Sequence, residues 1–471
     1  MKFLTKILLA FLVLIFPLSA VAQKKSTLNT VDLIVRDGTV VTMNGERRII
    51  ENGAVAINNG KIVAVGKSEE IAKQFVAKET INAVGKAIIP GLINTHTHAP
   101  MTLLRGLADD LELSEWLTKY IFPAEAKNVN EEFVRAGTQL ALAEFVRGGT
   151  TTFCDMYYFE DAIADETAKA GVRAVLGETI IDFPAPDNKT NAEAMADAEK
   201  FVKKWQGHPL VVPAIAPHAP YTVSEEHLKA VRELSDKLNA PVIIHLAEAQ
   251  SEMDDIFRKK GMRSIEYVSK IGFLSNRTIA AHVIFANDEE IQILKRAGVG
   301  VAHNPQSNMK LAAGIARIPE MLRADLAVGL GTDGAASNND LDLWEEMDTA
   351  AKLHKVFSKD PKVVSAREVF EMATIRGARA LHLEKEIGSL EPGKRADLVV
   401  VDMDDLNQIP VYDNIYSTLV YATKANDVRT VIIEGKTIMR DRNLLTLNEK
   451  VIKLRTAKLR QLIINSLTNN R

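Results

Sequence analysis

The sequence predicts an α/β protein whose central part is a (β/α)8 barrel and whose two ends together form a small β domain. Eight short apolar runs alternate with helical patterns in the middle of the chain, as a barrel of eight strand–helix units requires. Segments with strand-like alternation and Asp-Gly or Asn-Gly turns flank this region on both sides. In addition, most of the histidines stand where predicted strands end.

The N-terminal residues 1–22 are predicted to be a secretory signal peptide. Two lysines precede an apolar stretch from Ile7 to Leu18, and an Ala-Val-Ala segment follows, with cleavage expected before Gln23. The apolar stretch is shorter than the roughly 20 residues that span a bilayer. We therefore expect an exported protein, periplasmic or secreted, with no stable membrane insertion after cleavage. The alternative is an uncleaved membrane anchor.

Composition limits the classes of function. The 471 residues are 46% hydrophobic and 25% charged, with a net charge of −3, which is ordinary for a large globular chain. There is no long basic run, so no nucleic-acid partner is expected. Cys154 is the only cysteine, which excludes an intrachain disulfide and a cysteine metal cluster.

Both chain ends are predicted to contribute to one β domain, from residues 23–89 and 385–445. The alternation in "DLIVRDGTVVTM" and "GAVAINNGKIVAVG" returns near the other end in "ADLVVVDMDDL" and "VRTVIIEGKTIM". The barrel is assigned to residues 90–384. Residues 446–471 are assigned to a C-terminal helix, because their pattern is amphipathic.

The eight predicted barrel strands are apolar runs separated by helical patterns. An open, doubly wound sheet is the alternative, but no Gly-rich dinucleotide fingerprint follows the first strand. Asn130 and Ser224 are placed to cap two of the helices. The runs are Ala87–Thr95, Thr150–Asp155, Val172–Thr179, Leu210–Pro217, Pro241–His245, Thr278–His282, Gly298–His303 and Leu326–Asp333.

His96 and His98 stand two residues apart in "INTHTHAPMTLL", just after the first apolar run. Side chains two residues apart point to the same side of an extended segment. At the C-terminal end of a barrel strand, where active sites of barrels lie, both imidazoles can hold one divalent metal. By itself the pair is a weak signal, and the alternative is two partly buried histidines bonded to backbone.

Other strand ends strengthen the metal interpretation. His245 ends "PVIIH", with Glu248 three residues on, His282 ends "TIAAH", and Asp333 ends "LAVGLGTD". Four metal ligands are proposed from these ends: His96, His98, His245 and Asp333. A catalytic metal also keeps one position open for water. Glu248 stands beside these ligands, is not assigned as one of them, and is suited to carrying protons. His282 is predicted to orient or polarise the attacked group, or to support a ligand.

Two more histidines stand at strand ends, and the remaining four do not. His218 follows the run in "IAPHAPY". His303, in "VAHNPQSN", is predicted to be structural or to form a pocket wall. The other four are predicted to be structural or solvated: His208, His227, His354 and His382.

Taken together, "PGLINTHTHAPMTLLRG", "HLAE", "AHVIF", "AHNPQSNMKLAAGIA" and "GLGTDGAASNN" resemble the amidohydrolase superfamily. More narrowly they resemble its methylthioadenosine/S-adenosylhomocysteine deaminase and chlorohydrolase branch. The resemblance runs from about Val31 to Lys436. It implies a distorted (β/α)8 barrel with a β-sandwich and one divalent metal per chain, zinc first and iron as the alternative. "LVVPAIAPHAPY" contains no lysine that could bridge a second metal.

The resemblance also implies hydrolytic deamination of a small heterocyclic amine, such as methylthioadenosine or adenosine, by water. Glu248 would carry a proton to the ring nitrogen, while His282 and Asp333 would help activate the water. Substrate contacts would come from Glu125 in "FPAE", which corresponds to a ribose-binding position, and from His218. Trp116 is assigned to the pocket wall, with a helix-core role as the alternative.

One position departs from the family pattern. Nucleoside-specific members carry an arginine just after the third strand and another in the next loop, whereas this chain has Glu178 and, in the loop, only Lys189. Glu178 is therefore expected to disfavour the anionic tail of S-adenosylhomocysteine.

Two alternatives to the deaminase prediction stay open. One is a hydrolase of a cyclic amide or a ring C–halogen bond, which the same water chemistry would serve. The other is a non-catalytic periplasmic protein that binds a metal or ligand. The sequence also leaves open whether the protein is a homo-oligomer.

Overall fold

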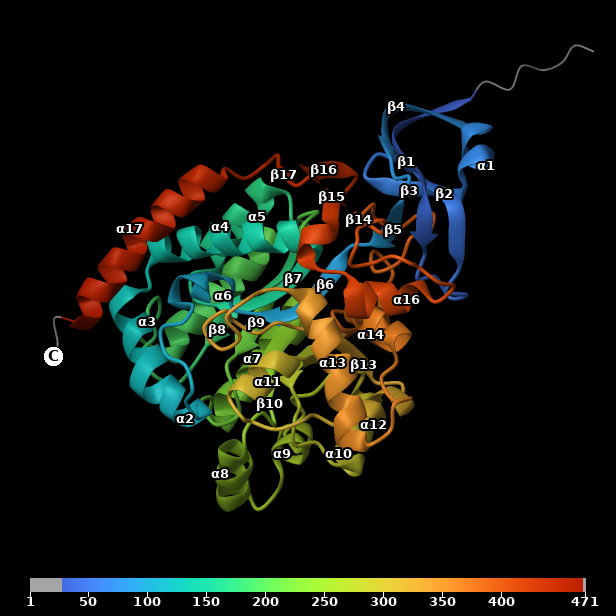
Figure 1. The fold of residues 1–471 in the computed structure, drawn as a ribbon. Coiled ribbons are helices and arrows are strands. Elements are labelled where there is room, and N and C mark those ends of the chain that lie inside the picture. The colour runs from blue at the N-terminus through green and yellow to red at the C-terminus, as the bar shows by residue number, and fades with distance from the viewer. Residues whose placement is uncertain (1–27, 469–471) are drawn as a thin grey trace, which may run out of the picture.

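The structure is a computed structural model that describes residues 28–468, so the predicted signal peptide lies outside the described residues. Eight parallel strands pair in chain order to form the barrel sheet (Figure 1). These strands are β6 (Leu92–Thr97), β7 (Thr150–Tyr157), β8 (Arg173–Ile180), β9 (Val211–Pro217), β10 (Val242–Leu246), β11 (Thr278–His282), β12 (Gly300–His303) and β13 (Ala327–Leu330).

The first and last strands come together through the segment that follows β13. The Asp333 amide donates to the His96 carbonyl at 3.0 Å, and the Asn94 side chain donates to Thr332 Oγ1 at 2.7 Å. Gly329 permits this close approach, because a Cβ there would lie 2.3 Å from the Thr95 methyl carbon. The barrel therefore closes next to the predicted metal site.

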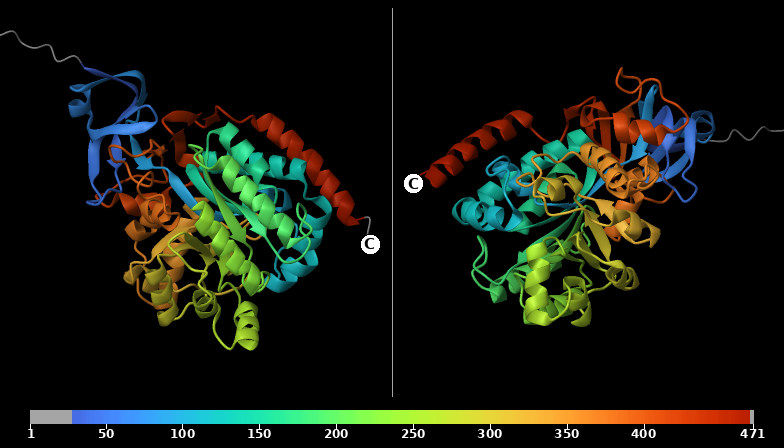
Figure 2. Two further views of the ribbon diagram at one scale, coloured as in Figure 1. Left: turned by 180° about the vertical axis from the view of Figure 1, so that it is seen from behind. Right: turned by 60° about the horizontal axis from the view of Figure 1, so that its bottom comes forward.

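Helices cover the outside of the strands (Figure 2). Asn130 and Ser224 cap α4 and α7 as predicted, accepting from the amides of Phe133 and His227. The helices of the barrel region are η1 (Ala99–Leu104), α2 (Leu113–Glu115), η2 (Trp116–Ile121), α3 (Phe122–Asn128), α4 (Glu131–Gly148), α5 (Glu160–Ala170), α6 (Asn191–Trp205), α7 (Glu225–Leu238), α8 (Gln250–Lys260), α9 (Ser264–Lys270), α10 (Asp288–Ala297), α11 (Pro305–Lys310), α12 (Ile318–Arg323), α13 (Leu343–Ser358), α14 (Ala366–Met372) and α15 (Ile375–Ala380).

The prediction of one barrel strand over Ala87–Thr95 is wrong, because the structure divides this range between two strands of different sheets. β5 (Lys86–Pro90) pairs with strands of the terminal sheet, and only β6 belongs to the barrel. The chain changes sheets at Pro90 and Gly91. A Cβ at Gly91 would lie 2.0 Å from Thr151 Oγ1, so the crossing requires glycine. The apolar character of the sequence continues through this point, so it does not reveal that the chain passes from one sheet to the other.

Both chain ends build a second, nine-stranded mixed sheet, in the order β17-β16-β15-β14-β5-β1-β2-β3, with β4 pairing β1. Strands from the two ends share one apolar core, in which Val35 and Ile57 meet Leu398 and Ile432. Its elements are β1 (Asn29–Val41), β2 (Ile49–Asn58), β3 (Lys61–Lys67), α1 (Ser68–Ala72), β4 (Phe75–Asn82), β14 (Leu398–Asp402), α16 (Ile415–Ser417), η3 (Thr418–Ala422), η4 (Ala425–Asp427), β15 (Val428–Ile433), β16 (Lys436–Arg440) and β17 (Asn443–Leu444). The predicted fold class is confirmed.

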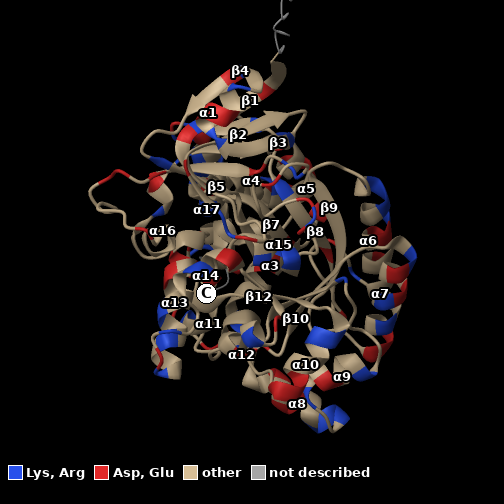
Figure 3. Ribbon diagram, turned by 90° about the vertical axis from the view of Figure 1, so that its right-hand side faces the viewer, with Lys and Arg blue, Asp and Glu red and all other residues tan. Residues whose placement is uncertain are grey.

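The chain ends in α17 (Glu449–Thr468), which lies along the outside of α4 (Figure 1). Arg455 joins the two helices by donating to Gln139 Oε1 at 3.1 Å. On the face shown in Figure 3, acidic and basic residues are interspersed over the outer helices. Within residues 28–468, none of the helices has the length and apolar character needed to cross a membrane.

Candidate active site

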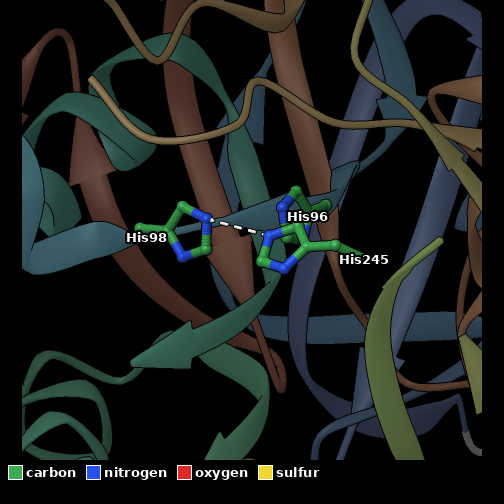
Figure 4. A group of neighbouring side chains, drawn as sticks. All are labelled: His96, His98 and His245. Carbon is green, nitrogen blue, oxygen red and sulfur yellow. Dashed lines mark hydrogen bonds between the residues drawn. The ribbon is translucent and has the colours of Figure 1, made fainter. Parts of the chain in front are cut away.

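Four of the predicted residues meet inside the barrel at the C-terminal ends of its strands. His96 belongs to β6 and His98 follows it, His245 belongs to β10, and Asp333 follows β13. His98 Nε2 and His245 Nε2 lie 3.4 Å apart (Figure 4). Asp333 Oδ1 lies 3.4 Å from His96 Nε2 and 3.2 Å from His98 Nε2. Residues separated by up to 237 positions in the chain thus converge on one small volume.

The chemistry of this cluster fits a divalent cation. The Nδ1 atoms of His98 and His245 face the carbonyl oxygens of Met156 at 2.7 Å and His218 at 2.8 Å, which assigns the proton to Nδ1 and leaves each Nε2 free to coordinate. His96 is completely buried and neither of its ring nitrogens has a hydrogen-bond partner within the described part of the chain. A bound cation would satisfy one of these nitrogens, and Nε2 is the one that faces Asp333. Two groups of ligand atoms lie close enough to hold one: His96, His98 and His245, and His96, His282 and Asp333.

Charge in the cluster is divided unevenly between the first two histidines. Burial lowers the pKa of His96 to about 4. Burial also opposes the charged form of His98, but Asp333 outweighs it and raises the pKa of His98 to about 9. Because imidazole coordinates only when a ring nitrogen is deprotonated, binding of a metal to both residues would release a proton.

Asp333 is held by side chains that the sequence interpretation missed. Ser307 Oγ and Ser337 Oγ donate to Asp333 Oδ2 at 2.7 and 2.9 Å, so Oδ1 is left toward the histidines. Asp333 itself adopts a left-handed backbone with φ of 59°, which aims the carboxylate into the barrel. Ser307 lies in the "AHNPQSN" motif, whose polar residues could have signalled this support.

Glu248 and His282 face each other beside the cluster, with 3.6 Å between Glu248 Oε1 and His282 Nε2. His282 Nδ1 lies 2.9 Å from Asn308 Oδ1, an arrangement that assigns the proton to Nδ1 and leaves Nε2 as acceptor. Burial raises the pKa of Glu248, which favours the form that carries a proton. The Glu248 amide donates to Glu252 Oε2 at 2.9 Å, so Glu252, also missed from sequence, fixes the turn.

A pocket extends outward from the cluster, and the four predicted substrate contacts, Glu125, His218, Glu248 and Trp116, all line it. Its wall consists of His98, Met101, Leu113, Trp116, Leu117, Ile121, Phe122, Glu125, Met156, Tyr157, Tyr158, Thr179, His218, Tyr221, His245, Glu248, His282, Leu311 and Asp333. Trp116 is buried and also lines the pocket, so it has both the core role and the pocket-wall role that were predicted for it. Its Nε1 donates to the Ala108 carbonyl at 3.2 Å.

Glu125 and His218 are buried polar groups of this wall. Tyr157 donates to Glu125 Oε1 at 2.6 Å, but burial outweighs this contact and raises the pKa of Glu125 to about 7. His218 Nδ1 lies 2.9 Å from Thr222 Oγ1, and burial lowers the pKa of His218 to about 3. His218 is therefore neutral at pH 7, whereas Glu125 is divided between its neutral and charged forms, and both can hydrogen-bond to an uncharged ligand.

His303 is structural rather than a part of the pocket wall. It is buried, and its Nε2 lies 3.0 Å from Nε2 of His354 on α13. His354 is therefore buried and structural, not solvated.

The expectation that Glu178 faces the substrate is wrong. Neighbouring residues of a strand point to opposite sides, and it is Thr179 that lines the pocket. Glu178 points to the outside of the barrel, where its Oε2 accepts from the Glu160 amide at 3.1 Å and it faces Asp187. Its carboxylate cannot select against a substrate tail by direct contact.

Comparison with known proteins agrees with this fold and site. The amidohydrolase family model matches residues 87–438. A 5-methylthioadenosine/S-adenosylhomocysteine deaminase of Syntrophobacter fumaroxidans is 47% identical over 417 residues, which are 88% of this chain and 95% of that protein. A 5′-deoxyadenosine deaminase of Methanosarcina barkeri is 43% identical over 89% of this chain and 96% of its own.

A solved structure is also closely similar. The crystal structure of an adenosine deaminase from Xanthomonas campestris, with bound zinc, aligns with a TM-score of 0.92 and 39% identity over 93% of this chain and all of the other. The fold and the buried histidine–aspartate cluster define a barrel hydrolase of the metal-dependent type. The chain belongs to the amidohydrolase family.

Proposed function

We propose that this protein is a metal-dependent hydrolytic deaminase that removes the exocyclic amine of a purine nucleoside, such as methylthioadenosine or adenosine, and releases ammonia. The observation that carries the proposal is the placement of Glu248 and His282, 3.6 Å apart, beside the histidine–aspartate cluster in the wall of one pocket. The names of the most similar relatives, all adenosine-type deaminases, support the same reaction class.

His96, His98, His245 and Asp333 would hold one divalent ion, zinc in the first place and iron as the alternative. The zinc in the Xanthomonas structure supports this choice. The fourth barrel strand, β9, has the sequence VVPAIAP and offers no lysine for a second ion. A bound divalent ion lowers the pKa of water from about 15.7 to about 7 and so supplies hydroxide at neutral pH.

The residues of this chain would do the proton transfers. Glu248, whose burial favours the protonated carboxyl, would donate its proton to the ring nitrogen beside the attacked carbon. His282 Nε2, fixed as an acceptor by Asn308, would accept a proton from the attacking water. The negative carboxylate of Asp333 would share this task. The proton that His282 or Asp333 takes from the water would then pass to the former amine, and ammonia would leave as the carbon–nitrogen bond breaks.

Substrate would be held by the polar groups of the wall. Glu125 would accept hydrogen bonds from sugar hydroxyls, oriented by Tyr157. His218 would contact the nucleoside, and Trp116 would supply an apolar face. The apolar part of the wall would limit the water around the bound substrate, which strengthens each of these electrostatic contacts.

The test is ammonia release by the mature chain from Gln23, loaded with zinc or iron and analysed for metal, on adenosine, methylthioadenosine and 5′-deoxyadenosine. Glu248→Gln should lower kcat by about 10²–10⁴-fold, the usual contribution of a general acid, at unchanged metal content. Glu266→Gln, an exposed glutamate of α9, is the matched control and should keep full activity. No ammonia from any compound, with one metal per chain, would refute the deaminase proposal.

Export is the second part of this proposal. The N-terminal pattern of residues 1–22 supports a signal peptide and a periplasmic or secreted protein. N-terminal sequencing of protein recovered from outside the cytoplasm should begin at Gln23. Recovery of the intact N-terminus from the membrane fraction would favour an uncleaved anchor.

A further inference from the structure

We propose that the pocket selects nucleosides whose 5′ substituent is uncharged, and that Phe122 and Phe183 at its mouth determine this selection. The inference rests on the proposed deaminase function and narrows its substrate class. The relatives' names include both kinds of substituent, since a methylthio or 5′-deoxy group is uncharged whereas the homocysteine tail is a zwitterion.

The side of the pocket away from the cluster is apolar. One continuous segment, α2 through the start of α3, supplies five of its side chains. They are Leu113, Trp116, Leu117, Ile121 and Phe122. Within the described part of the chain, the wall contains no lysine or arginine.

Phe122 lines the pocket, and Phe183, which is not part of the lining, packs on Phe122 at the surface; we take this pair as the rim of the pocket. The rings of Phe122 and Phe183 lie 5.5 Å apart in an edge-to-face arrangement, which joins the loop after β8 to the start of α3. Phe122 also lies 6.3 Å from His218, whose ring is 6.1 Å from Tyr221. Phe183 is 40% exposed, so this large apolar ring stands at the solvent edge rather than in the core. Such a rim binds an apolar substituent by burying its surface.

The cations nearest in sequence to this rim already have partners. Lys189 Nζ donates to the carbonyls of Ala185 at 2.6 Å and Pro186 at 3.4 Å, within its own loop. Lys119 Nζ lies 3.0 Å from Glu115 Oε1. The Asp182 carboxylate, next to Phe183 in sequence, already has partners of its own: it accepts from the Ser224 amide at 2.7 Å and lies 2.7 Å from His227 Nδ1. A substrate carboxylate would therefore lose water without gaining a cation.

The direct test compares kcat/KM of the metal-loaded enzyme for methylthioadenosine, 5′-deoxyadenosine and S-adenosylhomocysteine. We expect kcat/KM for S-adenosylhomocysteine to be lower by about 10–100-fold, mainly through KM, because uncompensated charge weakens binding without altering the reacting ring. Values within about 3-fold of each other would overturn the inference while leaving the deaminase proposal intact. Absence of ammonia from every compound would overturn both.

A charge added at the rim should change the selection. Phe183→Arg should raise kcat/KM for S-adenosylhomocysteine relative to methylthioadenosine by about 10-fold, since it supplies a partner for the carboxylate. The matched control is Phe357→Arg, the same change at an exposed phenylalanine at the end of α13, and it should leave the ratio unchanged. An unchanged ratio in a folded Phe183→Arg enzyme would contradict the role of Phe183. The wild-type comparison tests the selection whether or not this variant folds.

Discussion

Two buried polar clusters lie on opposite faces of the barrel sheet. The inner cluster of His96, His98, His245 and Asp333 faces the barrel interior and the pocket. The outer cluster of Asp155, Glu160, Glu178 and Asp187 lies on the other side of β7 and β8, against α5. On β8, Thr179 reaches the pocket while Glu178, one residue earlier, reaches the outer cluster.

The two clusters differ in how their charges are balanced. In the inner cluster burial opposes ionisation of Asp333, but His96 and His98 hold its pKa well below the usual range. In the outer cluster four carboxyls face one another, and each has a buried oxygen without a hydrogen-bond partner in the described residues. Burial, together with the neighbouring carboxyls, raises the pKa of Glu160 and Glu178 well above the ordinary value. The histidine–aspartate cluster therefore suits a cation, whereas Glu160 and Glu178 in the outer cluster retain their protons.

Removal of one inner imidazole should have the largest effect. His245→Ala should weaken metal binding by at least about 100-fold, because even residues that only support metal ligands contribute 10–100-fold. Catalytic activity should fall with the metal. Metal content after dialysis, measured beside ammonia release, checks both. Full metal retention in this variant would show that the cation is held by residues other than His245.

Loss of one support of Asp333 should have an intermediate effect. Ser307→Ala removes the 2.7 Å hydrogen bond to Asp333 Oδ2, while Ser337 remains. We expect metal affinity to fall by about 10-fold, at the lower end for such partners. Ser307→Thr keeps a hydroxyl and should restore affinity if the methyl group fits. Equal metal affinity in Ser307→Ala and the wild type would mean that the hydrogen bond from Ser337 is sufficient to hold Asp333.

A substitution in the outer cluster should change the stability of the protein but not its activity. The glutamine of Glu178→Gln can still accept from the Glu160 amide and can donate to Asp187. We therefore expect the free energy of unfolding to rise by about 1 kcal/mol. The ratio of kcat/KM for S-adenosylhomocysteine and methylthioadenosine should not change. A changed ratio would restore the original interpretation of Glu178 as a substrate selector.

The pH dependence of this gain has a definite sign. Below the unfolded-state pKa of about 4.3, Glu178 is protonated in both states and contributes no difference. As pH rises above that value, the unfolded chain loses its proton while the folded chain retains it, so the native state of the wild type loses relative stability. Glu178→Gln should therefore raise the melting temperature more at pH 8 than at pH 5. An equal shift at both values would contradict a raised pKa in the folded protein.

Local patterns in the sequence were enough to predict much of the barrel and which polar residues gather at the ends of its strands. Period-2 spacing identified His96 and His98, and the ends of apolar runs identified His245, His282 and Asp333. The capping roles of Asn130 and Ser224 also followed from local chemistry. These predictions succeed because strand direction and cap geometry depend on residues only a few positions apart.

Errors arose where partners come from distant parts of the chain. The break between β5 and β6 depends on contact of Gly91 with Thr151, which apolar character does not reveal. Ser307 and Asn308 acquire their roles only when α11 is packed beside β11 and β13. A motif match also does not say which side of a strand a residue faces, which is why Glu178 was misplaced.

By itself, then, the sequence determined the alternation of strands and helices, and the strand ends at which imidazoles and carboxylates gather. Only the tertiary structure decided which of these groups face one another, which face a pocket, and which are enclosed with like charges behind the sheet. The physical reason is that periodicity is set by local backbone geometry. The protonation state and metal affinity of a side chain depend instead on burial and on neighbours brought from elsewhere in the chain.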